Sequence, residues 1–357
     1  MVERAPLEGT AQLRWELADA PVHQGELFGR PRREVGRGEY RGLEFLHVEA
    51  RRIINEIKGD PFLPFRFTVN PYRGCSHACT YCFARPTHEY LGLGIGTDFD
   101  QRIVVKVNAV ERLQAELRPA RWRGEHIALG TNTDPYQRCE GKYRLTRGIL
   151  RTLIDAGNPF SILTKSTLVL RDLDLLEEAA ATGRVRVNLS VGTLDHHAWK
   201  TTEPGTPAPE RRLRAVAQLN EAGVPCGVLV APVIPGLTDD PAQLRAVAEA
   251  CVEVGAVSVS TVMLHLRPGV RDHFLEALRR SDPALADQLA ARYRGAYGPK
   301  ADRRRIGDQV HRAIAAAGGL AVDRFADGHL APPVETPVAV PVRPQPPADQ
   351  LSLPLPI

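Results

Sequence analysis

The chain has 357 residues, of which 43% are hydrophobic and 25% are charged, and its formal net charge is +4. This length suits one large domain or two smaller ones, and the composition is ordinary for a globular protein, which excludes fibrous and wholly disordered classes. No run of about 18 apolar residues occurs, and the first residues carry charges without an apolar core, so we expect neither a membrane-spanning helix nor a signal peptide.

Residues 1–45 are mostly polar and rich in Gly and Arg, and we expect them to form a flexible N-terminal extension. We expect residues 46–270 to form the core of the chain, and from about 65 to 265 apolar β-rich runs alternate with helical patterns, which predicts βαβ units and a parallel sheet. The expected strands cover 65–70, 102–108, 126–132, 160–166, 184–192, 226–233 and 256–264. The expected helices cover 109–118, 145–157, 168–183, 209–223 and 240–255. Most of these helices end in glycine, as helices commonly do.

Two further segments follow this alternating region. Residues 271–330 have a helical pattern, and we expect a C-terminal helical region there. Residues 331–357 contain nine prolines, which predicts a disordered, extended tail.

Cysteine and arginine usage gives two more indications. The six cysteines are spaced too irregularly for a disulfide framework, which favours a reducing cytoplasm and metal binding by clustered cysteines. Only six of the 46 basic residues are lysine. Two explanations of the arginine excess stay open, a GC-rich genome or a phosphate-bearing partner.

Three of the six cysteines, Cys75, Cys79 and Cys82, lie within eight residues directly after an expected strand. Three thiolates on one loop can each bind one iron of a [4Fe–4S] cluster and leave the fourth iron open. The alternative is structural zinc in a nucleic-acid-binding protein without catalysis. His77 lies between the first two cysteines, but no second Cys-x2-Cys pairs with this one, as such zinc sites generally require. A third interpretation keeps the cluster as a redox sensor or electron carrier.

The Cys-x3-Cys-x2-Cys spacing, with Tyr81 directly before Cys82, resembles the radical S-adenosylmethionine (SAM) superfamily. The resemblance implies a partial (β/α)6 barrel of the TIM type, which agrees with the alternation of strands and helices. It also implies a [4Fe–4S] cluster and SAM as cofactors, with Tyr81 beside the adenine. The implied reaction is reductive cleavage of SAM to a 5′-deoxyadenosyl radical that abstracts a hydrogen atom from a substrate. A reductant such as flavodoxin or ferredoxin is the implied electron donor.

Polar residues follow the expected strands in "GTNTDPYQ", "ILTKS" and "VNLSVGT". Each of them alone also suits a helix cap or a solvated strand end. Together with "NPYRGCSHACTYCFAR", these segments resemble the spore photoproduct lyase branch of the superfamily. That resemblance implies that Thr133, Lys165 and Ser190 contact SAM, and that Glu203, with Arg211 or Arg212, has a structural or SAM-orienting role.

The chain departs from this branch at Thr131, where the lyase has a cysteine that returns a hydrogen atom to its product. An O–H bond is too strong for that step, so we do not expect repair of the spore photoproduct. Cys139 lies eight residues further on and is a candidate to approach the site. The substrate class that the resemblance implies is related to nucleic acid, DNA or RNA.

Two segments outside these motifs carry further hypotheses. His88, Glu89 and Asp98 either line a substrate site or make local caps and bridges. In the tail, Gln350–Leu355 resembles the short peptides by which bacterial repair proteins bind the DNA sliding clamp, and a disordered tether suits that use.

Overall fold

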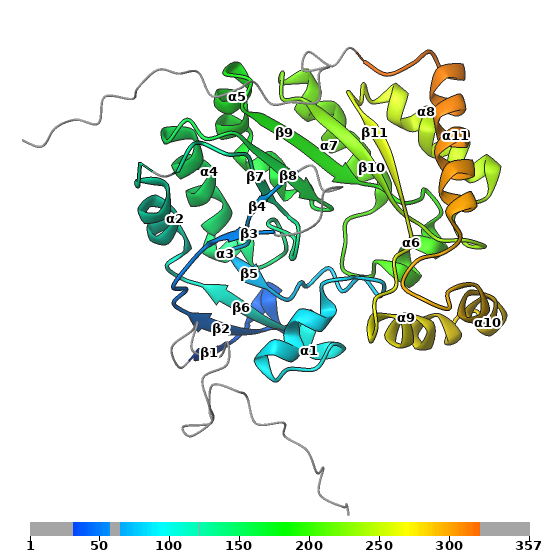
Figure 1. The fold of residues 1–357 in the computed structure, drawn as a ribbon, viewed down its shortest axis with the longest axis horizontal. Coiled ribbons are helices and arrows are strands. Elements are labelled where there is room, and N and C mark those ends of the chain that lie inside the picture. The colour runs from blue at the N-terminus through cyan, green and yellow to red at the C-terminus, as the bar shows by residue number, and fades with distance from the viewer. Residues whose placement is uncertain (1–30, 58–64, 121, 322–357) are drawn as a thin grey trace, which may run out of the picture.

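The computed structural model describes residues 31–57, 65–120 and 122–321, and two β-sheets organise them (Figure 1). The strands are β1 (Arg32–Val35), β2 (Glu44–Val48), β3 (Ile54–Glu56), β4 (Phe67–Val69), β5 (Tyr72–Arg73), β6 (Arg102–Lys106), β7 (Ile127–Leu129), β8 (Phe160–Thr164), β9 (Val185–Ser190), β10 (Cys226–Val233) and β11 (Val259–Met263). The larger sheet has the order β11–β10–β9–β8–β7–β4–β3, and the smaller has the order β1–β2–β6–β5.

Along the chain, most helices come between strands of the larger sheet, and the last three follow its final strand, β11. They are α1 (Thr97–Gln101), α2 (Ala109–Leu117), α3 (Glu140–Tyr143), α4 (Leu145–Asp155), α5 (Leu173–Ala181), α6 (His196–Thr202), α7 (Pro209–Glu221), α8 (Pro241–Glu253), α9 (Val270–Arg279), α10 (Pro283–Arg292) and α11 (Lys300–Ala316). Short 3-10 helices occur at η2 (Gly38–Tyr40), η3 (Arg85–Leu91) and η4 (Thr167–Asp172).

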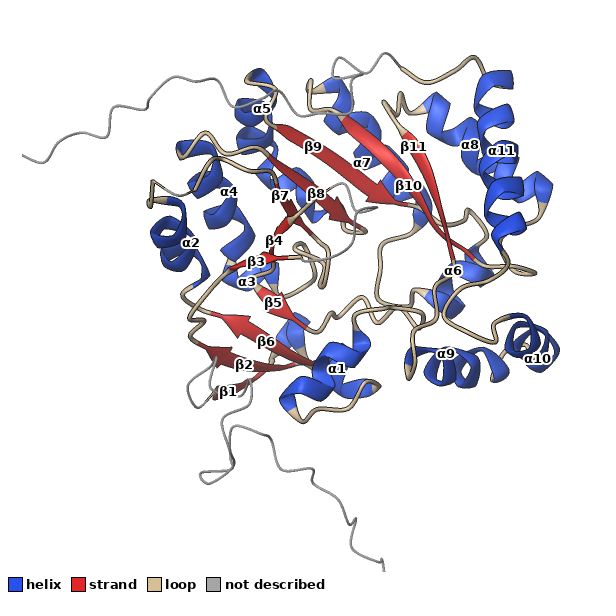
Figure 2. Ribbon diagram, viewed as in Figure 1, coloured by secondary structure: helices blue, strands red, loops and turns tan. Residues whose placement is uncertain are grey.

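The larger sheet is the partial barrel that the sequence predicts. Among the described residues, six strands run parallel in chain order, from β4 through β7, β8, β9 and β10 to β11, and β3 joins β4 antiparallel. Figure 2 shows these strands as one curved row, and α5 and α7 pack against β9. Because parallel neighbours need crossover connections, this order follows from the alternation of strands and helices.

Burial on both faces explains why the inner strands read as near-continuous apolar runs. In β10, Val228, Val230 and Val233 are almost fully buried, and Cys226 is buried beside them. They join the main hydrophobic core, which runs between the sheet and the helices that cover it. Cys251 on α8 belongs to the same core, so Cys226 and Cys251 are packing residues.

The smaller sheet is where the structure differs from the sequence predictions. Residues 102–106 form a strand, but β6 pairs with β2 and β5 in the smaller sheet and not in the barrel. Its buried apolar residues suit either sheet, so periodicity alone does not decide between them. Part of the expected flexible extension, residues 32–35 and 44–45, also forms strands. The edge strand β1 is mostly exposed, so it has no apolar alternation to reveal it, and backbone pairing with β2 holds it.

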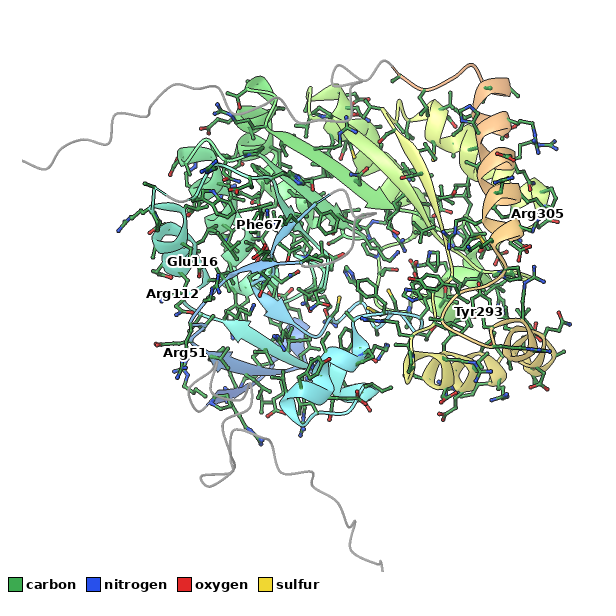
Figure 3. All side chains as sticks on the ribbon, viewed as in Figure 1. Arg51, Phe67, Arg112, Glu116, Tyr293 and Arg305 are labelled. Carbon is green, nitrogen blue, oxygen red and sulfur yellow. The ribbon has the colours of Figure 1, made fainter. Side chains whose placement is uncertain are left out.

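The carboxylate of Glu116 joins the segment between the two sheets to the helix α2. Glu116 accepts hydrogen bonds from the backbone N–H groups of Ile53 (2.7 Å) and Ile54 (3.1 Å). On the same helix, Arg112 donates to the backbone carbonyl of Arg51 (3.3 Å), and Figure 3 labels all three charged residues in this region. These contacts fix the entry of the chain into the barrel.

The C-terminal helical region is confirmed for residues 270–316. The helices α9 and α10 share a second core with the buried Tyr293, and α11 packs against α8 and β11. Residues 1–30, the proline-rich tail and the clamp-like segment Gln350–Leu355 lie outside the described residues, so these hypotheses stay predictions. Within the described part of the chain, no helix has both the length and the apolar character needed to cross a bilayer.

Candidate active site

One loop carries the three clustered cysteines. It leaves β5 and ends where η3 begins, and its backbone makes two successive turns. The N–H of Ala78 donates to the carbonyl of Cys75 (3.1 Å), and the N–H of Cys82 donates to that of Cys79 (3.2 Å). These turns place all three thiols on the wall of a single cavity of about 240 Å³.

A fully buried arginine holds this loop from behind. The guanidinium of Arg85 donates twice to the carbonyl of Cys79 (3.1 and 2.9 Å) and also to the carbonyls of Ile95 (2.8 Å) and Gly96 (3.1 Å). Its charge is balanced by Asp100 at 2.8 Å. Because a buried guanidinium needs this full set of acceptors, Arg85 fixes the middle of the cysteine loop to the segment before α1.

The start of the loop is fixed from the end of β7. Gly74 has a φ of +79°, and a Cβ atom there would lie 2.8 Å from the carbonyl oxygen of Phe99, so only glycine fits. The Gly74 carbonyl accepts hydrogen bonds from the hydroxyl of Thr133 (2.6 Å) and the amide of Gln137 (3.0 Å). The Gln137 carbonyl oxygen in turn accepts from the N–H of Ser76 (3.0 Å).

Polar side chains from three neighbouring strands meet the cysteines in this cavity. Thr133 lies beyond the end of β7, Lys165 directly follows β8, and Ser190 is the last residue of β9. They meet because the carboxyl ends of parallel strands lie at the same edge of a sheet, which is where βα barrels carry their chemistry. Together with Tyr81, all seven predicted site residues therefore line one cavity.

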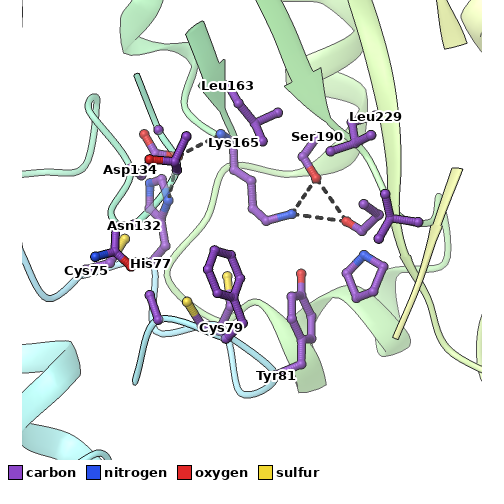
Figure 4. Close-up of a pocket in the computed structure, with 18 of the residues that line it drawn as sticks. Cys75, His77, Cys79, Tyr81, Asn132, Asp134, Leu163, Lys165, Ser190 and Leu229 are labelled. Carbon is purple, nitrogen blue, oxygen red and sulfur yellow. Dashed lines mark hydrogen bonds and ion pairs between the residues drawn. The ribbon is translucent and has the colours of Figure 1, made fainter. Parts of the chain in front are cut away.

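The Lys165 ammonium is the centre of the polar contacts on this wall. Its Nζ donates to the hydroxyl of Ser190 (2.6 Å) and to the carbonyl of Ala231 (3.2 Å), as Figure 4 shows. It also pairs with the carboxylate of Glu203 at 3.1 Å and lies 5.8 Å from the centre of the Tyr81 ring. One cation therefore joins the ends of β8, β9 and β10 to the cysteine loop.

Glu203, just after α6, is buried beneath this cation. Its carboxylate pairs with Arg212 at 2.5 Å and with Lys165, and it accepts a hydrogen bond from the hydroxyl of Tyr81. Burial alone raises the pKa of a carboxyl group, but the two cations and the Tyr81 and Arg212 hydrogen bonds together lower the pKa of Glu203 to about 2. Glu203 is therefore ionised at neutral pH and holds Tyr81 and Lys165 in their positions.

A second buried carboxylate, Asp134, joins the other side of the loop to the strand ends. It accepts hydrogen bonds from the hydroxyl of Thr164 (2.7 Å) and from the N–H groups of Lys165 (2.8 Å) and Tyr136 (2.9 Å). It also pairs with the imidazole of His77 at 3.2 Å (Figure 4). Although burial opposes ionisation, these contacts together lower the pKa of Asp134.

The cysteine arrangement can hold a [4Fe–4S] cluster. Within the described residues, no three His, Cys, Asp or Glu side chains are grouped to hold a single ion. A [4Fe–4S] cluster places each cysteine on a different iron, and the three thiols line one cavity. Burial raises the pKa of all three thiols, so binding of iron has to displace their protons.

Three residues for which the sequence left more than one role open do not line the cavity. Cys139 is fully buried in the core of the smaller sheet and does not line the cavity, so its candidate role there is not supported. His88 is buried behind the loop, with its Nε2 3.0 Å from the carbonyl of Arg102. Asp98 accepts a hydrogen bond from the N–H of Gly94 (2.8 Å), which agrees with the local capping alternative.

Sequence reasoning missed several parts of this cavity. The carbonyl of Ala231 has no sequence signal, because every residue has one, and only the fold brings it to Lys165. Phe83 and His265 also line the cavity. Phe83 directly follows the last clustered cysteine, which is a signal that a search around the motif would have found.

The sequence matches the Radical SAM superfamily over residues 69–248, which is half of the chain and includes every residue that lines the cavity from Cys75 to Pro232. The chain belongs to the radical SAM superfamily. Enzymes of this superfamily use a [4Fe–4S] cluster and SAM, so these are the cofactors of the chain.

Relatives of this radical SAM protein are similar over most of their own length. An uncharacterised protein of Mycobacterium tuberculosis is 44% identical over 329 residues, which covers 90% of this chain and 95% of the relative. An uncharacterised protein of Methanocaldococcus jannaschii is 32% identical over 198 residues, or 55% of this chain and 70% of the relative.

Solved structures support the fold of this radical SAM protein. Spore photoproduct lyase complexed with dinucleoside spore photoproduct superposes with a TM-score of 0.56 at 16% identity, over 78% of this chain and 81% of the lyase. A variant of the lyase with bound SAM and the same dinucleoside also gives a TM-score of 0.56. At this identity the likeness shows a shared fold.

Gly205 packs against the backbone of the cysteine loop, and its substitution tests whether this close packing is needed to bind iron. Its N–H donates to the carbonyl of His77 (3.0 Å), and a Cβ atom on it would lie 2.3 Å from the carbonyl oxygen of Ser76. We expect Gly205→Ala to push the loop backbone aside and to cause a several-fold loss of iron after anaerobic reconstitution. Gly295→Ala, where a Cβ meets nothing within 4 Å, should keep the wild-type iron content. Equal iron in the two variants would contradict this.

The low pKa of Glu203 predicts a pH-dependent contribution to stability. Its folded-state pKa of about 2 lies below the ordinary value of 4.5, so the stabilisation is complete above pH 4.5 and is lost as pH falls towards 2. The shift corresponds to roughly 3 kcal/mol. We expect iron-free wild type to be more stable than Glu203→Gln at neutral pH in urea unfolding, and the difference to shrink below about pH 4.5.

The control for this pH dependence is Glu249→Gln, which removes an exposed carboxylate from α8. Its stability should follow that of the wild type at every pH. A difference between wild type and Glu203→Gln that does not change with pH would show that Glu203 titrates normally in the folded protein.

Proposed function

We propose that this chain binds a [4Fe–4S] cluster through Cys75, Cys79 and Cys82 and reductively cleaves SAM for hydrogen abstraction from a substrate related to nucleic acid. The observation that carries the proposal is that the three cysteines and the ends of three parallel barrel strands line one cavity. When bound, the reduced cluster and SAM supply a 5′-deoxyadenosyl radical, and an electron donor such as flavodoxin or ferredoxin supplies the electron.

The residues of the chain act by binding, orientation and exclusion of water. Cys75, Cys79 and Cys82 would hold the cluster, and an iron without a protein ligand would be left open for SAM. Lys165 is placed to hold the carboxylate by charge, since its ammonium lies at the cavity wall on Ser190. Tyr81 presents its ring to the cavity for the adenine, and its hydroxyl is already fixed by Glu203.

Thr133 both lines the cavity and fixes the start of the cysteine loop by a hydrogen bond. Its hydroxyl donates to the carbonyl of Gly74 (2.6 Å) and accepts from Gln137 (2.9 Å), so Thr133 lines the cavity with its oxygen already hydrogen-bonded. Thr131 lies in the same cavity wall. With a threonine there, the chain has no thiol at the position where the lyase keeps its hydrogen donor, so we propose a reaction other than repair of the spore photoproduct.

The first test is anaerobic reconstitution with iron and sulfide, reduction with dithionite, addition of SAM and chromatography of 5′-deoxyadenosine. We expect the wild type to form it and Cys82→Ala to lose both the cluster absorbance and the product. Cys251→Ala, which changes a core cysteine outside the cavity, should retain both.

The same preparation tests the zinc alternative. A colourless protein with stoichiometric zinc and no 5′-deoxyadenosine would overturn the proposal and favour a structural role. A stable cluster without SAM cleavage would favour the redox-sensor interpretation.

A further inference from the structure

We propose that the mouth of the cavity is a stacking platform for a base of a single-stranded nucleic acid, formed by Phe83, His265 and Tyr297. This inference rests on the proposed function, because it names the feature that would bring a nucleic-acid substrate to the cofactors. It adds residues that lie outside the SAM contacts and beyond the strand ends.

Apolar and aromatic side chains reach the mouth from two sides of the cavity. Phe83 comes from the cysteine loop and Val262 from β11, and both line the cavity while remaining 44% and 45% exposed. His265 lines the cavity just after β11. Large apolar side chains that stay half-exposed at the opening of a cavity indicate a binding site, and a flat ligand packed against them would bury them.

The His265 ring is already stacked on a second ring. The centroids of His265 and Tyr297 lie 4.2 Å apart with the ring planes 5° from parallel. A backbone bridge between the two residues and a hydrogen bond from the N–H of Leu266 to the carbonyl of Ala296 (2.9 Å) hold them together. Because Tyr297 is 63% exposed, the pair extends the cavity wall to the protein surface.

Charge around this pair favours a phosphate-bearing ligand. The Arg303 guanidinium lies 5.9 Å from the centre of the Tyr297 ring. Lys300, Arg304 and Arg305 line a shallow cavity on the first turns of the same helix, α11. Lys300, Arg303 and Arg304 supply positive charge on the first turns of α11, while Asp308 also lines that cavity and Arg305 is paired with Asp239 at 3.1 Å.

The His265 ring itself is kept neutral. Burial, together with the charge of Arg267, lowers the pKa of His265. A neutral imidazole stacked on tyrosine offers a flat apolar face, and the cations beside it offer contacts to a sugar–phosphate backbone. Aromatic rings interleaved with cations are the combination by which proteins bind single strands without reading sequence, whereas a small apolar ligand would have no use for the cations.

The test uses reconstituted wild type with SAM and fluorescein-labelled single strands of about 12 nucleotides, one of DNA and one of RNA, followed by fluorescence anisotropy. We expect binding of at least one strand. Tyr297→Ala should weaken it roughly 5- to 100-fold, while Tyr297→Phe, which keeps the ring, should bind like the wild type. Tyr90→Ala is the matched control, because Tyr90 is 55% exposed and lies outside the cavity lining.

A second measurement separates stacking from charge. Arg303→Gln should reduce the slope of log Kd against log salt by about one, and Tyr297→Ala should leave that slope unchanged. Cluster absorbance of each variant checks that it folds around its cofactor.

The outcomes distinguish this inference from the proposed function. If the wild type forms 5′-deoxyadenosine but binds neither strand, or if Tyr297→Ala binds as tightly as Tyr297→Phe, the stacking platform is wrong and SAM cleavage stands. If no 5′-deoxyadenosine forms although a strand binds with the expected loss in Tyr297→Ala, the platform stands and the proposed function is wrong.

Discussion

The cavity depends on one buried carboxylate. Glu203 lies after α6, and its ion pairs with Arg212 on α7 and with Lys165 after β8 join three separate parts of the barrel. Its hydrogen bond from Tyr81 adds the cysteine loop to the same unit. Because removal of one partner from a buried ion pair leaves an uncompensated charge, each of these residues constrains the others. The positions of the cofactor-facing side chains follow from this network.

Asp134 has the corresponding role on the opposite side of the cysteine loop. It joins His77, within the motif, to the ends of β7 and β8. The loop is thus held by one carboxylate on each side and by Arg85 from behind, with few polar atoms left unsatisfied at the cavity. Such rigid support is what a cofactor site requires, since small displacements of the ligating groups lose activity.

The sequence predicted the barrel strands and their helices well because apolar strand runs and helical patterns follow one another along the chain, and most of the helices end in glycine. It also predicted which residues meet at the cavity, since the ends of parallel strands share one edge. It did not predict β1, whose exposed residues carry no alternation, or the sheet to which β6 belongs. Contacts such as the Ala231 carbonyl with Lys165 depend on how distant strands are brought together, and no local pattern records that.

The cavity is lined at one side by β11, an edge strand of the barrel. Among the described strands, β11 pairs only with β10, so the barrel is not closed there. An unpaired edge strand is normally covered, and here α11 packs on β11 while Tyr297 bridges to His265 just beyond it. The same elements that cover the edge therefore also carry the aromatic and basic side chains of the mouth.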